Sequence, residues 1–363
     1  MSTIAVVLGT RAEMIKIAPL ARLLADRVRI LHTGQDFDGG LSSSVLAELE
    51  LSGVAGLAMV GGRARAAQIG LALSALDDYF ARRPPSVVIV HGDTNAALAG
   101  ALAANARRIP LVHVEAGLRS YDREQPEEYN RVVIDHLADL LCAPTTGNVA
   151  NLRAESIGDE RVRLTGSTIV EAVQRHLPSP ERRLDVLRTH GVKPDGYVLA
   201  TVHRPENTED RGALHAIATE LADMAANGLP VLFSVHPRTR EALTASGLHD
   251  VLYPVIQVPP LQYGEFLSLA RHAAVLVSDS GGIQEEVTVL KRPLVVVRAS
   301  TERPESLVHF ARLVPPGPAI GDSVREVVQA RPDLSGRPCP YGEQATTRII
   351  AAIEEMLARR TRR

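Results

Sequence analysis

Short apolar segments rich in β-branched residues alternate along the whole chain with longer segments of helical periodicity. The first apolar segment is Ile4–Leu8, and a helical pattern follows from Glu13 to Leu24. Later apolar segments of the same kind are predicted as strands: Val28–His32, Val87–His91, Leu111–Glu115, Val162–Leu164, Tyr197–Thr201, Val231–Val235, Val251–Ile256, Val275–Ser278 and Leu294–Val297. Apolar strands that alternate with helices are typical of parallel sheets with right-handed crossover connections. The pattern therefore predicts an α/β fold.

The alternation is interrupted by a polar, proline-containing stretch at Leu177–Glu181 and then begins again. A chain of 363 residues is also long for a single hydrophobic core. We therefore predict two Rossmann-like domains that face a cleft, the first over residues 1–170 and the second over residues 171–344. The last helical pattern, from about Gln344 to Arg360, has no strand after it, and we expect residues 345–363 to cross back onto the first domain.

Composition excludes several classes of partner. The net charge is −2, so the chain lacks the basic field that nucleic-acid binding requires. No apolar run reaches membrane-spanning length, and the chain enters a strand near its N-terminus, so we expect neither a membrane segment nor a signal peptide. The two cysteines, Cys142 and Cys339, form no disulfide framework or metal-ligand spacing, and we expect them to be inert thiols of a cytoplasmic protein.

The segment Ser278–Glu286 reads Ser-Asp-Ser-Gly-Gly-Ile-Gln-Glu-Glu and directly follows a predicted strand. Its two glycines let a ligand approach the main chain, and a helix that begins at about Ile283 presents amides without an intrahelical partner, which favour an anion. Glu286 lies about one turn beyond Gly282 and can accept hydrogen bonds from hydroxyl groups. A site that binds a diphosphate next to a pair of hydroxyl groups fits a nucleotide. The alternative interpretation is a plain strand-to-helix connection.

Polar clusters also follow other predicted strands. They are Gly9–Arg11, His91–Thr94, His113–Arg119, Thr201–Asn207, Val235–Pro237 and Thr301–Glu305. In open parallel sheets a ligand binds outside the carboxyl ends of the strands. We therefore expect two half-sites, one on each domain, to face each other across the cleft.

Single members of these clusters also have ordinary structural interpretations. Asp93 is a good N-cap for the helix predicted at Asn95–Ala106, and Arg11 could pair with Glu13 at the start of its helix. Glu115 is harder to explain in this way, because a carboxylate that ends a buried apolar strand needs a charged or functional partner.

The histidines and the acidic pair leave similar alternatives open. His91, His113 and His236 could be hydrogen-bonded packing residues, and Glu127-Glu128 after Pro126 could be an ordinary acidic first turn of a helix. The joint placement of all these groups, and no single one of them, indicates an active site.

In their order along the chain, these motifs resemble the non-hydrolysing UDP-N-acetylglucosamine 2-epimerases. The motifs are Gly9–Arg11 with Lys16, His91–Thr94, His113–Arg119, Pro126–Arg131, His203–Asn207, Ser278–Glu286 and Thr301–Glu305. The match runs from about residue 4 to about residue 345. The resemblance implies a glycosyltransferase-B-like fold, a homodimer, a UDP-sugar substrate, and neither a metal nor a nicotinamide cofactor.

The resemblance also implies a reaction. UDP-GlcNAc and UDP-ManNAc would be interconverted by elimination of UDP across C1–C2 to 2-acetamidoglucal, followed by re-addition. The family assigns proton transfer and catalysis to the positions of Asp93, Glu115, Glu127 and His203. Substrate-binding positions carried over from the family are Arg11, Lys16, His203, Phe266, Ser280, Gly281, Gly282 and Glu286.

One departure from the family pattern falls in a second, regulatory UDP-GlcNAc site that many bacterial members carry. Gln35, Arg63 and His236 match positions of that site, whereas Asp36 stands where the family usually has histidine. The negative charge of Asp36 should weaken the binding of an anionic nucleotide sugar there. The regulatory site is therefore expected to be half retained.

Other functions remain open at this stage. Within the superfamily, the alternatives are a hydrolysing enzyme that releases ManNAc and UDP, and an epimerase of a modified UDP-HexNAc such as a diacetamido uronate. A glycosyltransferase of the same fold would share the nucleotide pocket but not the acids Glu115 and Glu127, and a UDP-sugar sensor would need none of the acids.

Overall fold

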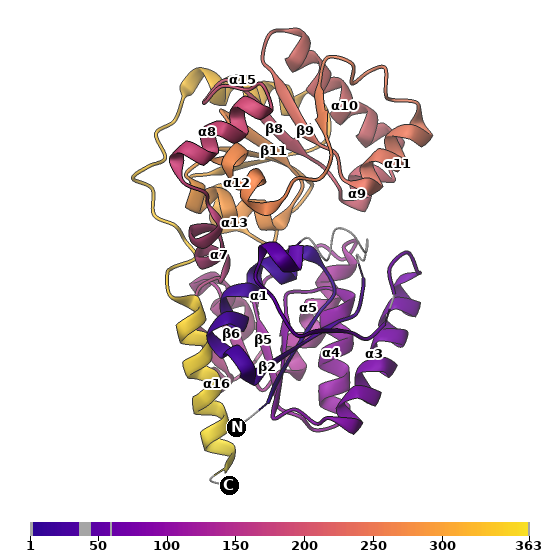
Figure 1. Ribbon diagram of the computed structural model, residues 1–363, viewed down its shortest axis with the longest axis vertical. Coiled ribbons are helices and arrows are strands. Elements are labelled where there is room, and N and C mark those ends of the chain that lie inside the picture. The colour runs from indigo at the N-terminus through magenta and orange to yellow at the C-terminus, as the bar shows by residue number, and fades with distance from the viewer. Residues whose placement is uncertain (1–2, 36–44, 59, 362–363) are drawn as a thin grey trace. The chain divides into compact units, whose positions relative to one another are not determined.

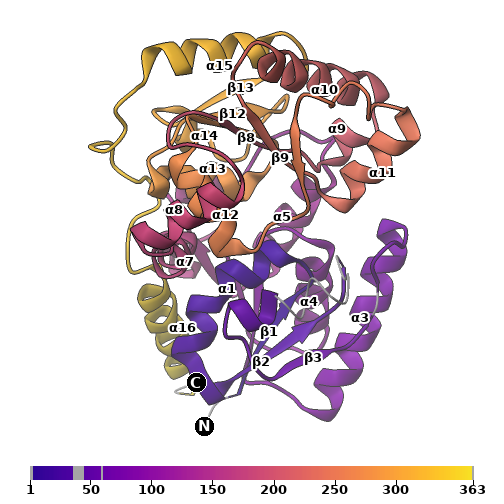
Figure 2. The same ribbon diagram turned by 45° about the horizontal axis from the view of Figure 1, so that its top comes forward.

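The computed structural model describes residues 3–35, 45–58 and 60–361 of the chain, so Asp36 lies outside the described residues. The chain divides into two compact units (Figure 1 and Figure 2). Unit 1 comprises Met1–Ala172 and Tyr341–Arg363, and unit 2 comprises Val173–Pro340. Each unit is built on its own parallel sheet.

The sheet of unit 1 has seven strands in the described residues, in the order β3-β2-β1-β4-β5-β6-β7. The strands are β1 (Ile4–Leu8), β2 (Val28–His32), β3 (Val54–Gly56), β4 (Val87–His91), β5 (Leu111–Val114), β6 (Leu140–Ala143) and β7 (Val162–Leu164). All pairs are parallel, and Val7 of β1 lies between Leu31 of β2 and Val90 of β4. The strand order reverses between β1 and β4, where a parallel sheet offers a ligand site at its carboxyl edge.

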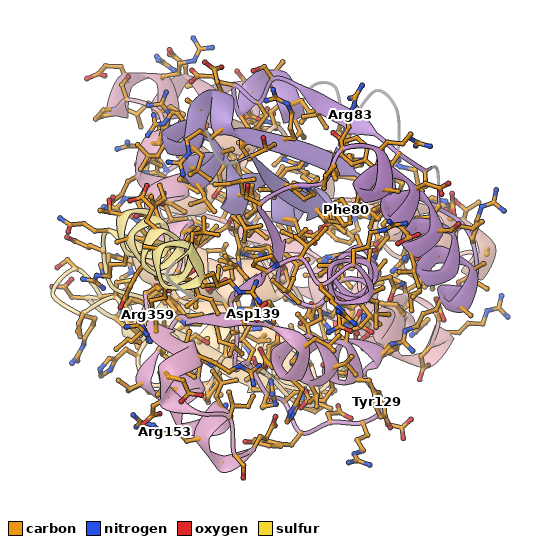
Figure 3. All side chains as sticks on the ribbon, turned by 90° about the horizontal axis from the view of Figure 1, so that it is seen from below. Phe80, Arg83, Tyr129, Asp139, Arg153 and Arg359 are labelled. Carbon is orange, nitrogen blue, oxygen red and sulfur yellow. The ribbon has the colours of Figure 1, made fainter. Side chains whose placement is uncertain are left out.

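Helices cover this sheet. They are α1 (Arg11–Leu24), α3 (Arg65–Arg82), α4 (Asn95–Ala106), α5 (Pro126–Leu137), α6 (Thr146–Ala154), α7 (Ile169–His176, which begins in unit 1 and ends in unit 2) and α16 (Ala345–Thr361), with short 3-10 turns at Ala25–Arg27 and Asp159–Arg161. The core on one face joins Val7 and Val90 of the sheet to Ala97 of α4, Phe80 of α3 and Ile134 of α5. Phe80 is labelled in the view from below (Figure 3).

The sheet of unit 2 has six parallel strands, in the order β10-β9-β8-β11-β12-β13. They are β8 (Val198–Thr201), β9 (Val231–Ser234), β10 (Ile256–Val258), β11 (Val275–Ser278), β12 (Leu294–Val297) and β13 (Ala311–Val314). The helices are α8 (Pro180–Thr189), α9 (Pro205–Thr208), α10 (Arg211–Ala226), α11 (Pro237–Ser246), α12 (Tyr263–His272), α13 (Gly281–Leu290), α14 (Pro304–Leu307) and α15 (Ala319–Ala330). The order reverses between β8 and β11; the turn after β8 carries His203, and Gly282 lies in the first turn of α13, which follows β11.

The predicted α/β class with parallel sheets is confirmed, and so is the return of the last helix to the first part of the chain. Helix α16 belongs to unit 1, packs near α1 and β6, and forms ion pairs from Glu354 to Arg27 and from Arg360 to Asp139. No helix in the described part of the chain is long and apolar enough to cross a membrane.

The strand predicted at Val251–Ile256 is wrong. Residues 251–254 form turns, held by hydrogen bonds from the Tyr253 amide to the Asp250 carbonyl and from the Val255 amide to the Leu252 carbonyl. These turns bury Leu252 and Val255, so the apolar residues reach the core without a strand. The short strands β3, β6 and β13 were not predicted, and α13 begins at Gly281, slightly before the expected start.

Close packing of α4 on the sheet makes a specific prediction for its glycine. A Cβ added at Gly100 would lie 2.9 Å from Cγ1 of Val90 and 3.0 Å from Cβ of Val7. We therefore expect Gly100→Ala to destabilise the protein by about 1–3 kcal/mol through overpacking, although alanine gains about 1 kcal/mol of helix propensity. Gly70 in α3 is exposed, and its added Cβ would meet no described atom within 4 Å.

Gly70→Ala is the matched control for this test. It gains the same helix propensity without the steric cost, so it should raise the free energy of unfolding by about 0.5–1 kcal/mol. Urea unfolding of the two variants measures both effects, and equal shifts in the same direction would contradict the packing argument.

Candidate active site

The turn after β1 is joined to the turn after β4 by the buried carboxylate of Glu13. Thr10 is the N-cap of α1 and forms a capping box with Glu13. The Glu13 carboxylate accepts hydrogen bonds from the amides of Gly9 at 2.9 Å and Thr10 at 2.8 Å, and from the Thr94 hydroxyl at 2.7 Å. This arrangement fixes the start of the helix that carries Arg11, which is half-buried.

The protonation of Glu13 is unusual. Burial raises its pKa from 4.5 to about 7, although the hydrogen bonds from Gly9, Thr94 and Thr10 act in the opposite direction. Sequence reasoning considered Glu13 only as a partner for Arg11. The capping-box pattern of threonine followed three residues later by glutamate was the available signal for its actual role.

Glu115 follows β5 and is buried between two basic groups from other elements. Its Oε1 lies 2.6 Å from Nζ of Lys16 on α1, and its Oε2 lies 3.2 Å from Nε2 of His91 at the end of β4. All three side chains are at most 5% exposed. Burial lowers the pKa of His91 to about 4, so this ring is neutral near pH 7. The expectation that Glu115 needs a charged partner is confirmed, and that partner is Lys16.

Main-chain contacts hold Glu115 in place as well. Glu115 adopts a left-handed backbone conformation with φ of 72°. The amides of Glu115 and Ala116 both donate to the carbonyl of Cys142 in β6, each at 3.1 Å. The carboxylate is therefore fixed by its backbone, by Lys16 and by the end of the neighbouring strand.

Asp93 lies on the turn after β4, close to Glu115. A Cβ built on the preceding Gly92 would lie 3.6 Å from Oε2 of Glu115. Asp93 Oδ2 accepts a hydrogen bond from Nη2 of Arg131 at 2.6 Å. The N-cap interpretation of Asp93 is wrong, because Thr94 caps α4 and accepts the amide hydrogen of Ala97 at 3.0 Å.

The two adjacent acids of α5 have different surroundings. Glu128 is buried and accepts hydrogen bonds from the amides of Ser120 and Tyr121 and from Nη1 of Arg131, so it closes the preceding loop and orients the arginine that holds Asp93. The side chain of Glu127 makes no hydrogen bond or ion pair with any other described residue, and Glu127 is half-buried. Of the pair, Glu128 is therefore the structural carboxylate.

In unit 2, a buried aspartate organises the turn after β8. Asp279 accepts hydrogen bonds from the amides of His203 and Arg204 and from the side chain of Asn207, at 2.9–3.1 Å. Its Oδ1 also lies 3.2 Å from Nδ1 of His203. Burial alone would raise the pKa of Asp279, but His203 and these hydrogen bonds hold it well below its usual value. The carboxylate thus fixes His203 through Nδ1, and the ring is partly exposed.

The Ser-Gly-Gly turn forms the amino end of α13, with Ser280 as the N-cap. The two glycines differ. A Cβ at Gly281 would lie 2.5 Å from Nη1 of Arg303 and 2.7 Å from Oε1 of Glu302, whereas a Cβ at Gly282 would meet, among the described atoms, Ser280 Oγ at 3.8 Å. Gly281 is therefore required by packing, and Gly282 presents an open face at the helix end.

A buried charge network lies beneath this turn and was missed by sequence reasoning. Arg298 Nη1 lies 2.9 Å from Oε2 of Glu302, and Arg303 Nε lies 3.3 Å from Oε2 of Glu285. Arg303 also contacts Glu302. The Thr301–Glu305 motif therefore serves, at least in part, to support α13.

The remaining predicted residues lie in ordinary surroundings. Glu286 is buried in the first turns of α13, and Phe266 is half-buried on α12. Gln35 Oε1 accepts the amide hydrogen of Ala96 at 3.0 Å, which satisfies an open amide of α4. Arg63 is exposed, and the His236 ring is the N-cap of α11 and lies 5.6 Å from the His203 ring. No cluster of His, Cys, Asp or Glu that could hold a metal ion occurs among the described residues.

Comparison with known proteins identifies the family. The family model for UDP-N-acetylglucosamine 2-epimerase matches residues 23–354. A UDP-N-acetylglucosamine 2-epimerase of Methanococcus maripaludis is 37% identical over 314 residues, which cover 85% of this chain and 86% of the relative. A UDP-2,3-diacetamido-2,3-dideoxy-D-glucuronate 2-epimerase of Pseudomonas aeruginosa is 33% identical over 301 residues, with 82% and 83% covered.

Solved structures show the same relationship. The crystal structure of Methanocaldococcus jannaschii UDP-GlcNAc 2-epimerase in complex with UDP-GlcNAc and UDP matches with a TM-score of 0.88 at 33% identity, and covers 98% of this chain and 99% of that chain. Fold, motifs and relatives together define an epimerase with two parallel α/β sheets. The chain belongs to the UDP-N-acetylglucosamine 2-epimerase family, and the resemblance seen in its motifs is confirmed.

The buried Glu13 carboxyl should make stability depend on pH. Because its pKa is about 7 in the folded protein and 4.5 in the reference state, the folded state binds an extra proton between these values. The free energy of unfolding of the wild type, measured against Glu13→Gln, should therefore fall as the pH rises through this window, by up to about 3 kcal/mol. Denaturant unfolding of both proteins at several pH values measures the difference. A constant difference would show that Glu13 keeps one protonation state throughout.

Proposed function

We propose that this protein interconverts UDP-GlcNAc and UDP-ManNAc by eliminating UDP across C1–C2 and adding it back, without a metal or redox cofactor. The observation that supports this proposal most directly is the pairing of carboxylates on neighbouring turns of unit 1. Glu115 is buried between Lys16 and His91, and the turn that carries Asp93 passes close to its Oε2.

The reaction requires groups that move protons at carbon. C2 of the sugar has no adjacent carbonyl, so removal of its proton must accompany departure of the diphosphate. Positioned carboxylates contribute roughly 10²–10⁴-fold to such proton transfers. Glu115, Asp93 and Glu127 are the carboxylates proposed for this work, and Lys16 compensates the buried charge of Glu115.

The departing UDP must be held while the glucal forms. The open amino end of α13 at Ser280, Gly281 and Gly282 offers amides and the positive end of the helix dipole to a diphosphate. His203, fixed by Asp279, and Arg11 are proposed to bind the same anion. Glu286 and Phe266 are proposed for the ribose hydroxyls and the uracil.

The substrate could also be a modified UDP-HexNAc. The Pseudomonas aeruginosa relative is a 2-epimerase of a diacetamido glucuronate nucleotide, so the sugar substituents can vary among proteins of this similarity. Such a substrate would undergo the same C2 chemistry at the same acids. It is therefore a second candidate that differs in the sugar and not in the mechanism.

We propose further that the enzyme acts as a homodimer in the cytoplasm and that Gln35, Arg63 and His236 form the remnant of a regulatory nucleotide-sugar site. The support for all three statements is the family resemblance. Light scattering would give the oligomeric state, and rate curves against added UDP-GlcNAc would reveal regulation.

The decisive test is proton exchange at C2. In D₂O the product and the recovered substrate should gain deuterium at C2, and the dominant product should be intact UDP-ManNAc, because UDP is retained between the two steps. Glu115→Gln removes the titrating group and should lower turnover by at least about 10²-fold, whereas the exposed control Glu355→Gln should not. NMR of the reaction follows both signals.

Other outcomes identify the alternatives. Stoichiometric free UDP with ManNAc would identify a hydrolysing enzyme, and deuteration restricted to a diacetamido uronate would identify the modified substrate. A complete absence of C2 deuteration with UDP-HexNAc substrates would favour a transferase or a binding protein.

The two glycines of the α13 turn permit a separate test of the diphosphate site. Gly282→Val should leave the fold intact, because its Cβ would meet the described atoms only in an ordinary contact, 3.8 Å from Ser280 Oγ, but it should obstruct the approach of phosphate and weaken UDP binding by at least about 10-fold. Gly336→Val, in open space elsewhere in unit 2, is the matched control and should bind UDP normally. Calorimetry with UDP measures both, and wild-type affinity in Gly282→Val would refute the assignment.

A further inference from the structure

His113 is a buried residue that the reaction scheme above does not use. It lies on β5, and its side chain is completely buried. Its Nε2 lies 2.8 Å from the carbonyl oxygen of Gly92, and its Nδ1 lies 2.6 Å from Oδ1 of Asp135 on α5. The ring therefore connects the turn that carries Asp93 with helix α5.

The partners of the ring determine where its protons are. A carbonyl oxygen can only accept a hydrogen bond, so Nε2 must carry a hydrogen that it donates to Gly92. Asp135 Oδ2 accepts a hydrogen bond from the Gly117 amide and lies 2.7 Å from Nη1 of Arg119, an ion-pair geometry that requires Asp135 to be a carboxylate. A carboxylate also only accepts, so Nδ1 must carry a hydrogen as well. A neutral ring has one N–H and cannot satisfy both partners.

The second oxygen of Asp135 reaches the turn that carries Glu115. Asp135 Oδ2 accepts a hydrogen bond from the amide of Gly117 at 3.1 Å and from Nη1 of Arg119 at 2.7 Å. Arg119 also makes two hydrogen bonds to Glu155, at 2.6 and 2.7 Å. With His113 protonated, the buried Asp135 carboxylate lies between two cations, His113 and Arg119, and the charge of Arg119 is balanced by the partly exposed Glu155, which also lies 3.3 Å from His136.

Both turns adopt conformations that need support. Gly92, Glu115 and Gly117 all have positive φ, at 62°, 72° and 81°. For Glu115, which has a side chain, this region is sparsely populated and persists where the surrounding structure enforces it. The contacts of His113 at Gly92 and of Asp135 at Gly117 lie directly beside the two acids.

We propose that His113 is a positioning residue, held as an imidazolium by Asp135, whose two N–H groups fix the distance between the turns that carry Asp93 and Glu115. The effect on catalysis rests on the proposed function, whereas the protonation of the ring does not. His113 would act on catalysis through the positions of the two acids. Both acids must reach C2 of the sugar, and a displacement of about 1 Å can reduce turnover by about 10²-fold.

Ring-nitrogen NMR of the full-length protein with ¹⁵N-labelled histidine tests the protonation directly. At pH 7 we expect both nitrogens of His113 to give the signature of a protonated ring, assigned by its loss in His113→Gln. Asp135→Asn removes the anion beside the ring and should convert His113 to a neutral form. A single-tautomer signature of His113 in the wild type would overturn the proposal, and so would a ring that stays doubly protonated in Asp135→Asn.

Kinetics test the positioning role. His113→Gln keeps a donor for one partner only, so kcat should fall about 10- to 100-fold while KM and UDP affinity change less than about threefold. His215→Gln, the same change at an exposed histidine of unit 2, should leave kcat unaltered. A normal kcat in a folded His113→Gln protein would overturn the proposal. If that variant does not fold, the His113 signals are assigned instead by through-bond correlation to the His113 backbone, and the NMR of the wild type and of Asp135→Asn still decides it.

The two proposals can fail independently. An enzyme without C2 exchange on UDP-HexNAc substrates but with a doubly protonated His113 would refute the proposed function and leave the charge state of the ring standing. Normal epimerase turnover with a neutral His113 would do the reverse.

Discussion

The first half-site depends on one constraint, which is that a carboxylate buried at the end of an apolar strand must have its charge compensated. Lys16 supplies that charge to Glu115 at 2.6 Å, and it can do so because the capping box of Glu13 fixes the start of α1. Glu13 in turn bonds Thr94, which caps α4 next to Asp93. Three turns of the sheet are thereby joined through buried polar contacts that leave few oxygens unused.

The site residues of unit 2 also depend on a buried carboxylate whose charge is compensated. The buried carboxylate of Asp279 lies next to the turn that carries His203. Hydrogen bonds from main-chain amides and Asn207, together with the His203 ring, stabilise its negative charge. In unit 1 the buried carboxylate of Glu115 pairs with the ammonium of Lys16, whereas in unit 2 the buried carboxylate of Asp279 fixes the imidazole ring of His203. Each unit therefore combines a rigid sheet edge with a small number of side chains that remain available to a ligand.

Sequence alone located most of the candidate residues, because carboxyl ends of parallel strands meet at one edge of a sheet. The positions of Asp93, Glu115 and Gly282 followed from that rule. The strand-end rule by itself could not distinguish Glu127 from Glu128, or Gly281 from Gly282. The loop amides of Ser120 and Tyr121 bind Glu128, and Gly281 packs against Arg303, and no pattern in the sequence records these contacts.

The other incorrect predictions from the sequence also have physical reasons. The strand expected at Val251–Ile256 failed because turns can bury apolar side chains as well as a strand can. Thr94 replaced Asp93 as the N-cap because Arg131 takes the Asp93 carboxylate. The network of Arg298, Glu302 and Arg303 gave no periodic signal, since ion pairs in a loop leave no pattern of apolar positions.

The contact between β6 and Glu115 has a consequence for how the site tolerates mutation. Cys142 holds the amides of Glu115 and Ala116 through its carbonyl oxygen, and its own thiol takes no part in that contact. A main-chain acceptor cannot be deleted by exchanging a side chain. Substitutions at Cys142 can therefore change the side chain while the main-chain hydrogen bonds to Glu115 and Ala116 persist. The position of Glu115 is in this way insensitive to the identity of the side chain at a residue that supports it.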